Sequence, residues 1–112
     1  MLSVEKLNEF GADTISGIKR CANNEELYLR LVKMVPSNKG FSDLYEAIKN
    51  NSLDEAFLAA HGLKGILANL SLDPILKPIK EITELLRNKE NIDYSKYLLI
   101  IEEKRKLLEE ML

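Results

Sequence analysis

Apolar residues recur at spacings of three and four along most of the chain, which is the pattern of amphipathic helices. The clearest stripe lies within 53–70, where six apolar residues share one side of a helical wheel: Leu53, Ala56, Ala60, Leu63, Leu67 and Leu70. Similar spacing predicts two short helices over 4–10 and from 13 to about 21, and longer ones over 26–34, 41–51, 73–87 and from 93 to the C-terminus. No stretch alternates in the manner of a half-buried strand.

Helix-capping residues stand at most of these boundaries. The expected starts are Ser3, Asp13, Asn23 or Asn24, Ser42 or Phe41, Ser52, Asp73 and Asp93. The connections between the longer helices are short, which favours antiparallel neighbours. The sequence therefore predicts an all-α fold, an antiparallel up-down four-helix bundle with one or two short N-terminal helices, formed by a single domain over 1–112.

Composition narrows the possible functions. With 112 residues, 46% hydrophobic and 30% charged, the chain is globular, and its net charge of -2 argues against nucleic-acid binding. It has neither a signal peptide nor an apolar run near the ~20 residues of a membrane span. The lone Cys21 fits a reducing, cytoplasmic compartment. Nucleotide-binding, protease and metal-binding motifs are missing, so we expect no cofactor, no metal and no enzyme. The N-terminal Met favours a complete chain over a piece of a longer one.

The only histidine, His61, lies opposite the apolar stripe of the 53–70 helix and should be exposed. Leu58, Lys64, Gly65 and Ala68 are its surface neighbours at helical spacing. Gly65 costs about 1 kcal/mol in mid-helix relative to Ala, and its missing side chain would let another protein approach the imidazole. Lys64 would stabilise an anion there, and Leu58 would form an apolar rim. The group indicates a nucleophilic imidazole that meets a large anionic partner, although a lone histidine is more often a surface residue without a role.

The stretch AAHGLKGILANLSLDPILKPIKEITELLR resembles the histidine-containing phosphotransfer domain of two-component phosphorelays. The resemblance rests on the HGLKG motif with His61, Lys64 and Gly65, and on the A-N-L run from Ala68. It is looser over GADTISGIKRCANNEELYLRLV upstream. It departs from the family pattern at Ser71, where a glycine is usual, and at Thr83, where many members carry Gln or Glu.

The resemblance implies a monomeric phosphocarrier that accepts a phosphoryl group on His61 from a receiver-domain aspartate and passes it to another receiver. Lys64 would give electrostatic stabilisation and Gly65 clearance for the partner. The partners would be response-regulator receiver domains or a hybrid sensor histidine kinase, with Mg²⁺ bound only to the receiver. Leu58, Ala68, Ile15 and Ile18 would contact that partner. Thr83 is shorter than Gln or Glu, so whether Thr83, Glu84, Lys80, a water or no group at all orients the imidazole stays open.

Three alternatives stay open. A kinase dimerisation or phosphatase module would have an acidic residue after the histidine, where this chain has Gly62. A helical bundle used only to bind proteins, without phosphorylation, would leave His61 incidental. An enzyme that combines His61 with Cys21 or Tyr45 would need a fold that brings them together.

Overall fold

The computed structural model describes all 112 residues as seven α-helices and no strand, so the expected all-α fold is confirmed. The helices, in chain order, are α1 (Val4–Phe10), α2 (Thr14–Arg20), α3 (Glu25–Lys33), α4 (Lys39–Lys49), α5 (Leu53–Asn69), α6 (Asp73–Arg87) and α7 (Ser95–Glu110). The molecule measures 41 × 25 × 19 Å along its principal axes. None of its helices is both long and apolar enough to pass through a bilayer.

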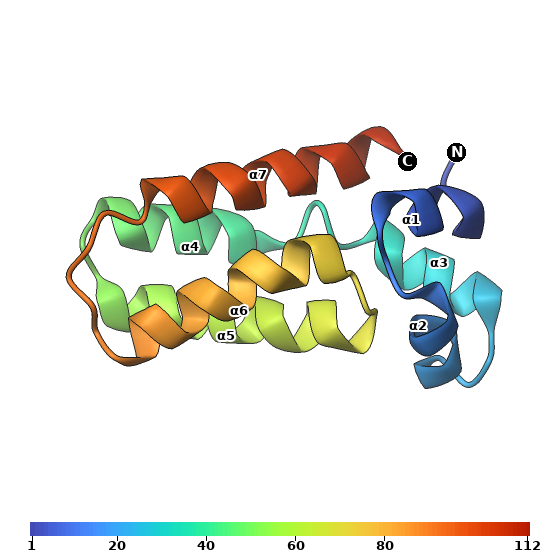
Figure 1. The fold of residues 1–112 in the computed structure, drawn as a ribbon, viewed down its shortest axis with the longest axis horizontal. Coiled ribbons are helices and arrows are strands. Elements are labelled where there is room, and N and C mark those ends of the chain that lie inside the picture. Colours follow the sequence, from blue (N-terminus) through green and yellow to red (C-terminus); the bar gives the residue numbers. More distant parts are fainter.

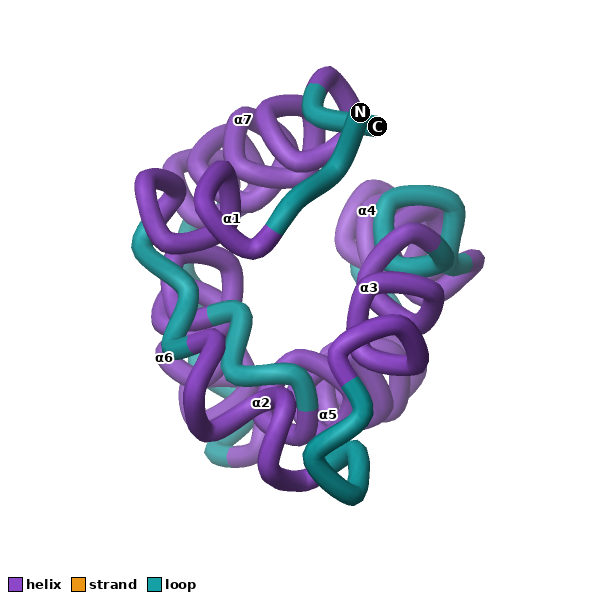
Figure 2. The backbone as a smooth tube through the Cα atoms, turned by 90° about the vertical axis from the view of Figure 1, so that its right-hand side faces the viewer, coloured by secondary structure: helices purple, strands orange, loops and turns teal.

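The four longest helices lie along the long axis of the molecule, and each runs opposite to the one before it (Figure 1). α5 packs against α4 on one side and against α6 on the other, and α7 packs against α6. The short helices α1, α2 and α3 cover one end of these four (Figures 1 and 2). Both chain termini lie at that same end.

One continuous hydrophobic core of 24 buried residues joins the two parts. The predicted stripe of α5 supplies five of them, since Ala56, Ala60, Leu63, Leu67 and Leu70 are all buried, while Leu53 is half-buried. Cys21 is buried at 5% exposure. It lies at the end of α2, within the packed end of the molecule.

The helix boundaries follow the predicted caps except at two places. The side chains of Ser3, Asp13 and Asn24 each accept a backbone N–H of the first helical turn, as expected. The prediction for α4 was wrong: it begins at Lys39, because the Asn38 side chain accepts the Gly40 N–H at 2.7 Å. α7 begins at Ser95 rather than at Asp93, whose carboxylate accepts the Ser95 N–H at 2.9 Å.

Candidate functional site

The outward side of α5 carries the only histidine of the chain and several exposed apolar residues. Its residues lie opposite the buried stripe, and His61 is exposed there, as the helical wheel predicted. Leu58 is 68% exposed, although an apolar side chain of this size gains free energy from burial. We use the name α5 face for its exposed residues Leu58, His61, Gly62, Gly65 and Ile66.

Two glycines flatten this face. A Cβ atom added to Gly62 or to Gly65 would meet nothing within 4 Å, so neither glycine is required by packing inside the chain. Both lie well inside α5, where glycine is unfavourable by about 1 kcal/mol relative to alanine. The helix surface is therefore open at both Gly62 and Gly65, and the role of Gly65 in partner clearance stays a prediction.

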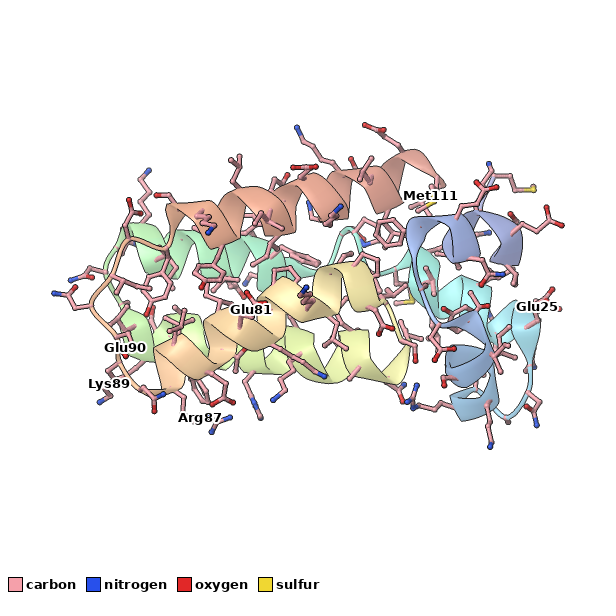
Figure 3. The ribbon with its side chains drawn as sticks, in the orientation of Figure 1. Glu25, Glu81, Arg87, Lys89, Glu90 and Met111 are labelled. Atoms are coloured by element: carbon pink, nitrogen blue, oxygen red, sulfur yellow. The ribbon has the colours of Figure 1, made fainter.

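The His61 side chain lies on the side of α5 that faces α6. Its ring stacks on Phe57, with 5.5 Å between ring centroids and 18° between planes. The guanidinium carbon of Arg87, at the end of α6, lies 4.9 Å from the centre of the same Phe57 ring. Figure 3 shows Arg87 at this edge, near Lys89 and Glu90. The stack orders the imidazole and leaves it accessible from the outside.

Sequence reasoning missed Phe57 and Arg87. Phe57 precedes His61 by four residues, a spacing that places two rings on the same side of a helix, and that signal was available. Arg87 comes from another helix and could not be found by spacing.

The three proposed orienting residues do not hold the imidazole. Thr83 is fully buried, and its hydroxyl donates to the Ile79 carbonyl oxygen within its own helix at 2.6 Å. The Glu84 carboxylate pairs with Arg87 at 3.4 Å, and Lys80 forms no hydrogen bond with His61. Stacking on Phe57, rather than a hydrogen bond, sets the position of the ring.

The other predicted contact residues divide into two groups. Lys64 and Ala68 are half-buried beside the α5 face. Ile15 and Ile18 lie on α2, which packs against the C-terminal end of α5 at Leu70. Since Leu70 is nine residues from His61, α2 contacts α5 about 13 Å along the helix from the imidazole. Ile15, at 82% exposure, therefore belongs to a separate surface, and Ile18 is half-buried against the core.

The enzyme alternative finds no support in the geometry. Cys21 is buried at the end of α2, and the Tyr45 hydroxyl donates to Glu102 of α7 at 2.9 Å. No cluster of three or more His, Cys, Asp or Glu side chains is arranged to hold a metal ion.

Two surface hollows adjoin the α5 face on its α4 side. One, of about 510 Å³, lies between α4 and the first half of α5. The other, of about 260 Å³, lies between the end of α3 and the second half of α5. Leu58 lines the first hollow and Ile66 the second, so the α5 face connects them.

Comparison with known proteins gives one kind of relative. The chain is 39% identical over 66 residues to an Hsp70-Hsp90 organising protein of Plasmodium falciparum, and to the corresponding protein of its isolate 3D7. The matched part is 58% of this chain, but only 25% of the first relative and 11% of the second. The chain therefore matches a quarter or less of the length of these curated relatives. No protein-family model and no solved structure matches it.

These comparisons contradict the resemblance to the histidine-containing phosphotransfer domain. The relatives found are chaperone-organising proteins, and no phosphotransfer family model matches the chain. The phosphocarrier function, its place in a two-component system, and the receiver-domain and histidine-kinase partners are therefore wrong. The HGLKG motif is short and lies on an exposed helix, so its residues satisfy the motif without the function.

Proposed function

We propose that this chain is a helical protein-binding module and that the α5 face is its contact surface. The observation that carries the proposal is Leu58, which is 68% exposed beside two glycines that leave the helix surface open. An exposed apolar side chain next to a surface without side chains allows a partner to approach closely and bury it. The module belongs to no enzyme class in this proposal and needs no cofactor.

The relatives suggest which partners to test first. They are named for organising Hsp70 and Hsp90, so we propose Hsp70 or Hsp90 as the partner of this chain. The module would act in the cytoplasm, in agreement with the presence of only one cysteine in the sequence.

The finer architecture is part of the same proposal. We describe α4–α7 as an antiparallel up-down four-helix bundle, closed at one end by α1–α3, that acts as a single domain over 1–112. The reversal of direction at each connection and the shared core support this description. Such a bundle presents α5 as a rigid surface, since α4 and α6 pack against its two sides.

The experiment is a calorimetric titration of the full chain with purified Hsp70 and with purified Hsp90. Leu58→Glu should weaken the interaction by at least about tenfold, because it places a charge in the buried part of the contact. Leu99→Glu is the matched control: Leu99 lies on α7 and is 72% exposed, so the same change there should leave the affinity unaltered.

Two results would contradict the proposal. Absence of binding to either chaperone would remove them as partners of this chain. Equal weakening by Leu58→Glu and Leu99→Glu would show that the α5 face is not the contact surface. Circular dichroism of both variants checks that the helices are kept.

A further inference from the structure

The two hollows beside the α5 face lie in line along α5. Glu55 and Ala59 line the first hollow and Ile66 and Asn69 line the second, and with Gly62 between them these residues form one stripe at spacings of four and three. Gly62 lies at the middle of this stripe and carries no side chain to separate the hollows. We call this surface the α4–α5 groove. From Glu55 to Asn69 it extends for roughly 20 Å, which is the length of a helix of about four turns.

One end of the groove is apolar. It is formed mainly by Leu31, Met34, Val35, Ile66 and Leu70. Met34 is 63% exposed and Ile66 39% exposed, so a substantial apolar surface of this hollow is open to solvent. A large apolar side chain from a partner would bury that surface, with a gain of roughly 25 cal/mol for each Å² removed from water.

The other end carries negative charge. Asp43 and Glu46 of α4 and Glu55 of α5 line the larger hollow, and none of these carboxylates forms an ion pair within the chain. Lys33 and Lys39 are exposed next to Met34 and Asn38, two lining residues of the apolar hollow. The groove is therefore apolar at one end and acidic at the other, and this difference would fix the direction of anything bound along it.

We propose that the α4–α5 groove binds an amphipathic helix of the partner, about four turns long, with large apolar side chains at one end and basic side chains at the other. The apolar end lies on Met34 and Ile66, and the basic end lies over Asp43, Glu46 and Glu55. A helix fits because it can rest its apolar side in the seam between two helices, and the molecule has no sheet edge to which a strand could add. This inference rests on the proposed function, since it states which kind of partner segment the module takes.

Gly62 has a specific role in this arrangement. It is the point where the bound helix would come closest to α5, since a side chain there would fill the passage between the two hollows. Neither glycine lines a hollow, but Gly62 lies on the stripe between the hollows, whereas Gly65 lies roughly 60° around the helix axis from it. A leucine at Gly62 meets open space and should not disturb the fold, and Glu103→Leu, at an exposed position of α7 outside the α5 face, is the matched control.

The test uses two synthetic peptides of about 16 residues, labelled for fluorescence anisotropy. Both carry leucines at helical spacing in the first two turns. One has lysines in the last two turns and the other has glutamates at those positions. The lysine peptide should bind the full chain at least about tenfold more tightly than the glutamate peptide. Gly62→Leu should weaken binding of the lysine peptide at least about tenfold, while Glu103→Leu, at an exposed position of α7, should bind it as the wild type does.

A charge reversal provides a second measurement that does not depend on steric block. Glu46→Lys should weaken the lysine peptide and strengthen the glutamate peptide. In the wild type, the lysine peptide should also shift the backbone amide signals of Met34 and Ile66 in an NMR titration, because its apolar end lies there. Equal affinity for both peptides, or equal effects of Gly62→Leu and Glu103→Leu, would overturn the proposal.

Failure of the groove can be told apart from failure of the proposed function. If Gly62→Leu binds a chaperone normally and Leu58→Glu does not, the groove proposal is wrong and the proposal of a protein-binding module is supported. Selective binding of the lysine peptide by a chain that binds neither chaperone would keep the groove and remove the chaperones as partners.

Discussion

At the scale of single residues, Tyr28 connects the two parts of the fold. It is fully buried on α3, and its hydroxyl donates to the Leu70 carbonyl oxygen at 3.0 Å, across 42 positions of sequence. That carbonyl lies at the C-terminal end of α5, where helix carbonyls have no partner within the helix. Burial raises the pKa of Tyr28 to about 12, with smaller contributions from Cys21 and Asp13.

Tyr28→Phe should therefore lower the free energy of unfolding by about 1 kcal/mol at pH 7, because a buried carbonyl loses its donor. The raised pKa adds a pH effect. The unfolded tyrosine loses its proton near pH 10 and the folded one near pH 12, so the contribution of Tyr28 is complete below pH 10 and is lost as the pH rises toward 12. Urea unfolding at pH 7 and at pH 11 measures both effects. A variant that loses stability at high pH as steeply as the wild type would contradict this role.

The same scale shows what the sequence could predict of the candidate site. The exposure of His61, Leu58 and Gly65 follows from helical periodicity alone, because position on a wheel decides burial once the helix is correctly placed. The stacking of His61 on Phe57 could have been predicted from their i,i+4 spacing. The contact of Arg87 with Phe57 could not, because it depends on how α6 packs on α5. The short HGLKG motif gave a wrong function, since few residues on one exposed turn do not specify chemistry.

At the scale of elements, two glycines inside helices differ in whether packing leaves room for a side chain. Gly17 in α2 is buried, and an added Cβ would overlap the Tyr28 ring and lie 2.8 Å from the Leu70 carbonyl oxygen. Its missing side chain allows α2 to pack on the end of α5. Gly65 has open space around it, so only helix propensity applies there.

Gly17→Ala should destabilise the fold by about 1–3 kcal/mol, because Tyr28 and the end of α5 must move apart. Gly65→Ala should instead stabilise it by about 0.5–1 kcal/mol, through the better propensity of alanine in a helix. Thermal unfolding of the two variants beside the wild type is the measurement. Shifts of the same sign in both variants would show that the contacts at Gly17 do not limit the packing of α2.

Helix boundaries show where prediction from sequence ends. Ser3, Asp13 and Asn24 were identified because each precedes an apolar run and has a side chain that can accept a backbone N–H. Asn38 has the same chemistry but was not identified, since we expected this helix to start at Ser42 or Phe41, and the first residues of α4 were missed. Tyr94 is the N-cap of α7 without a side-chain hydrogen bond and is buried, and neither feature can be inferred from the local sequence.

At the scale of the whole molecule, polar contacts fix α7 to the α4 side. The Arg105 guanidinium donates to Glu102 at 2.8 Å and to the Pro36 carbonyl oxygen at 3.0 Å, and the Tyr45 hydroxyl of α4 donates to the same Glu102 carboxylate. The contacts of α7 with Pro36 and Tyr45 join segments more than 50 residues apart in sequence, and neither was predicted. Helical periodicity identifies the apolar side of a helix but not the polar partners that set its rotation and position.

This network makes the free energy of unfolding depend on pH in the acid range. Bonding to Arg105 holds the pKa of Glu102 below its ordinary value of 4.5, against a smaller opposing effect of burial. A carboxyl with a lowered folded pKa contributes stability above its unfolded pKa and loses that contribution as the pH falls through the folded value. Glu102→Gln should therefore lower the free energy of unfolding by about 1 kcal/mol or less at pH 7, because the pair is partly exposed. It should also reduce the further loss of stability below pH 4.5.

Glu84→Gln is the control, since both partners of the Glu84–Arg87 pair are half-exposed and its removal should leave the free energy of unfolding unchanged. Urea unfolding at pH 7 and at about pH 3 separates these outcomes: parallel losses in the wild type and in Glu102→Gln would show that the Glu102–Arg105 pair does not hold α7 in place.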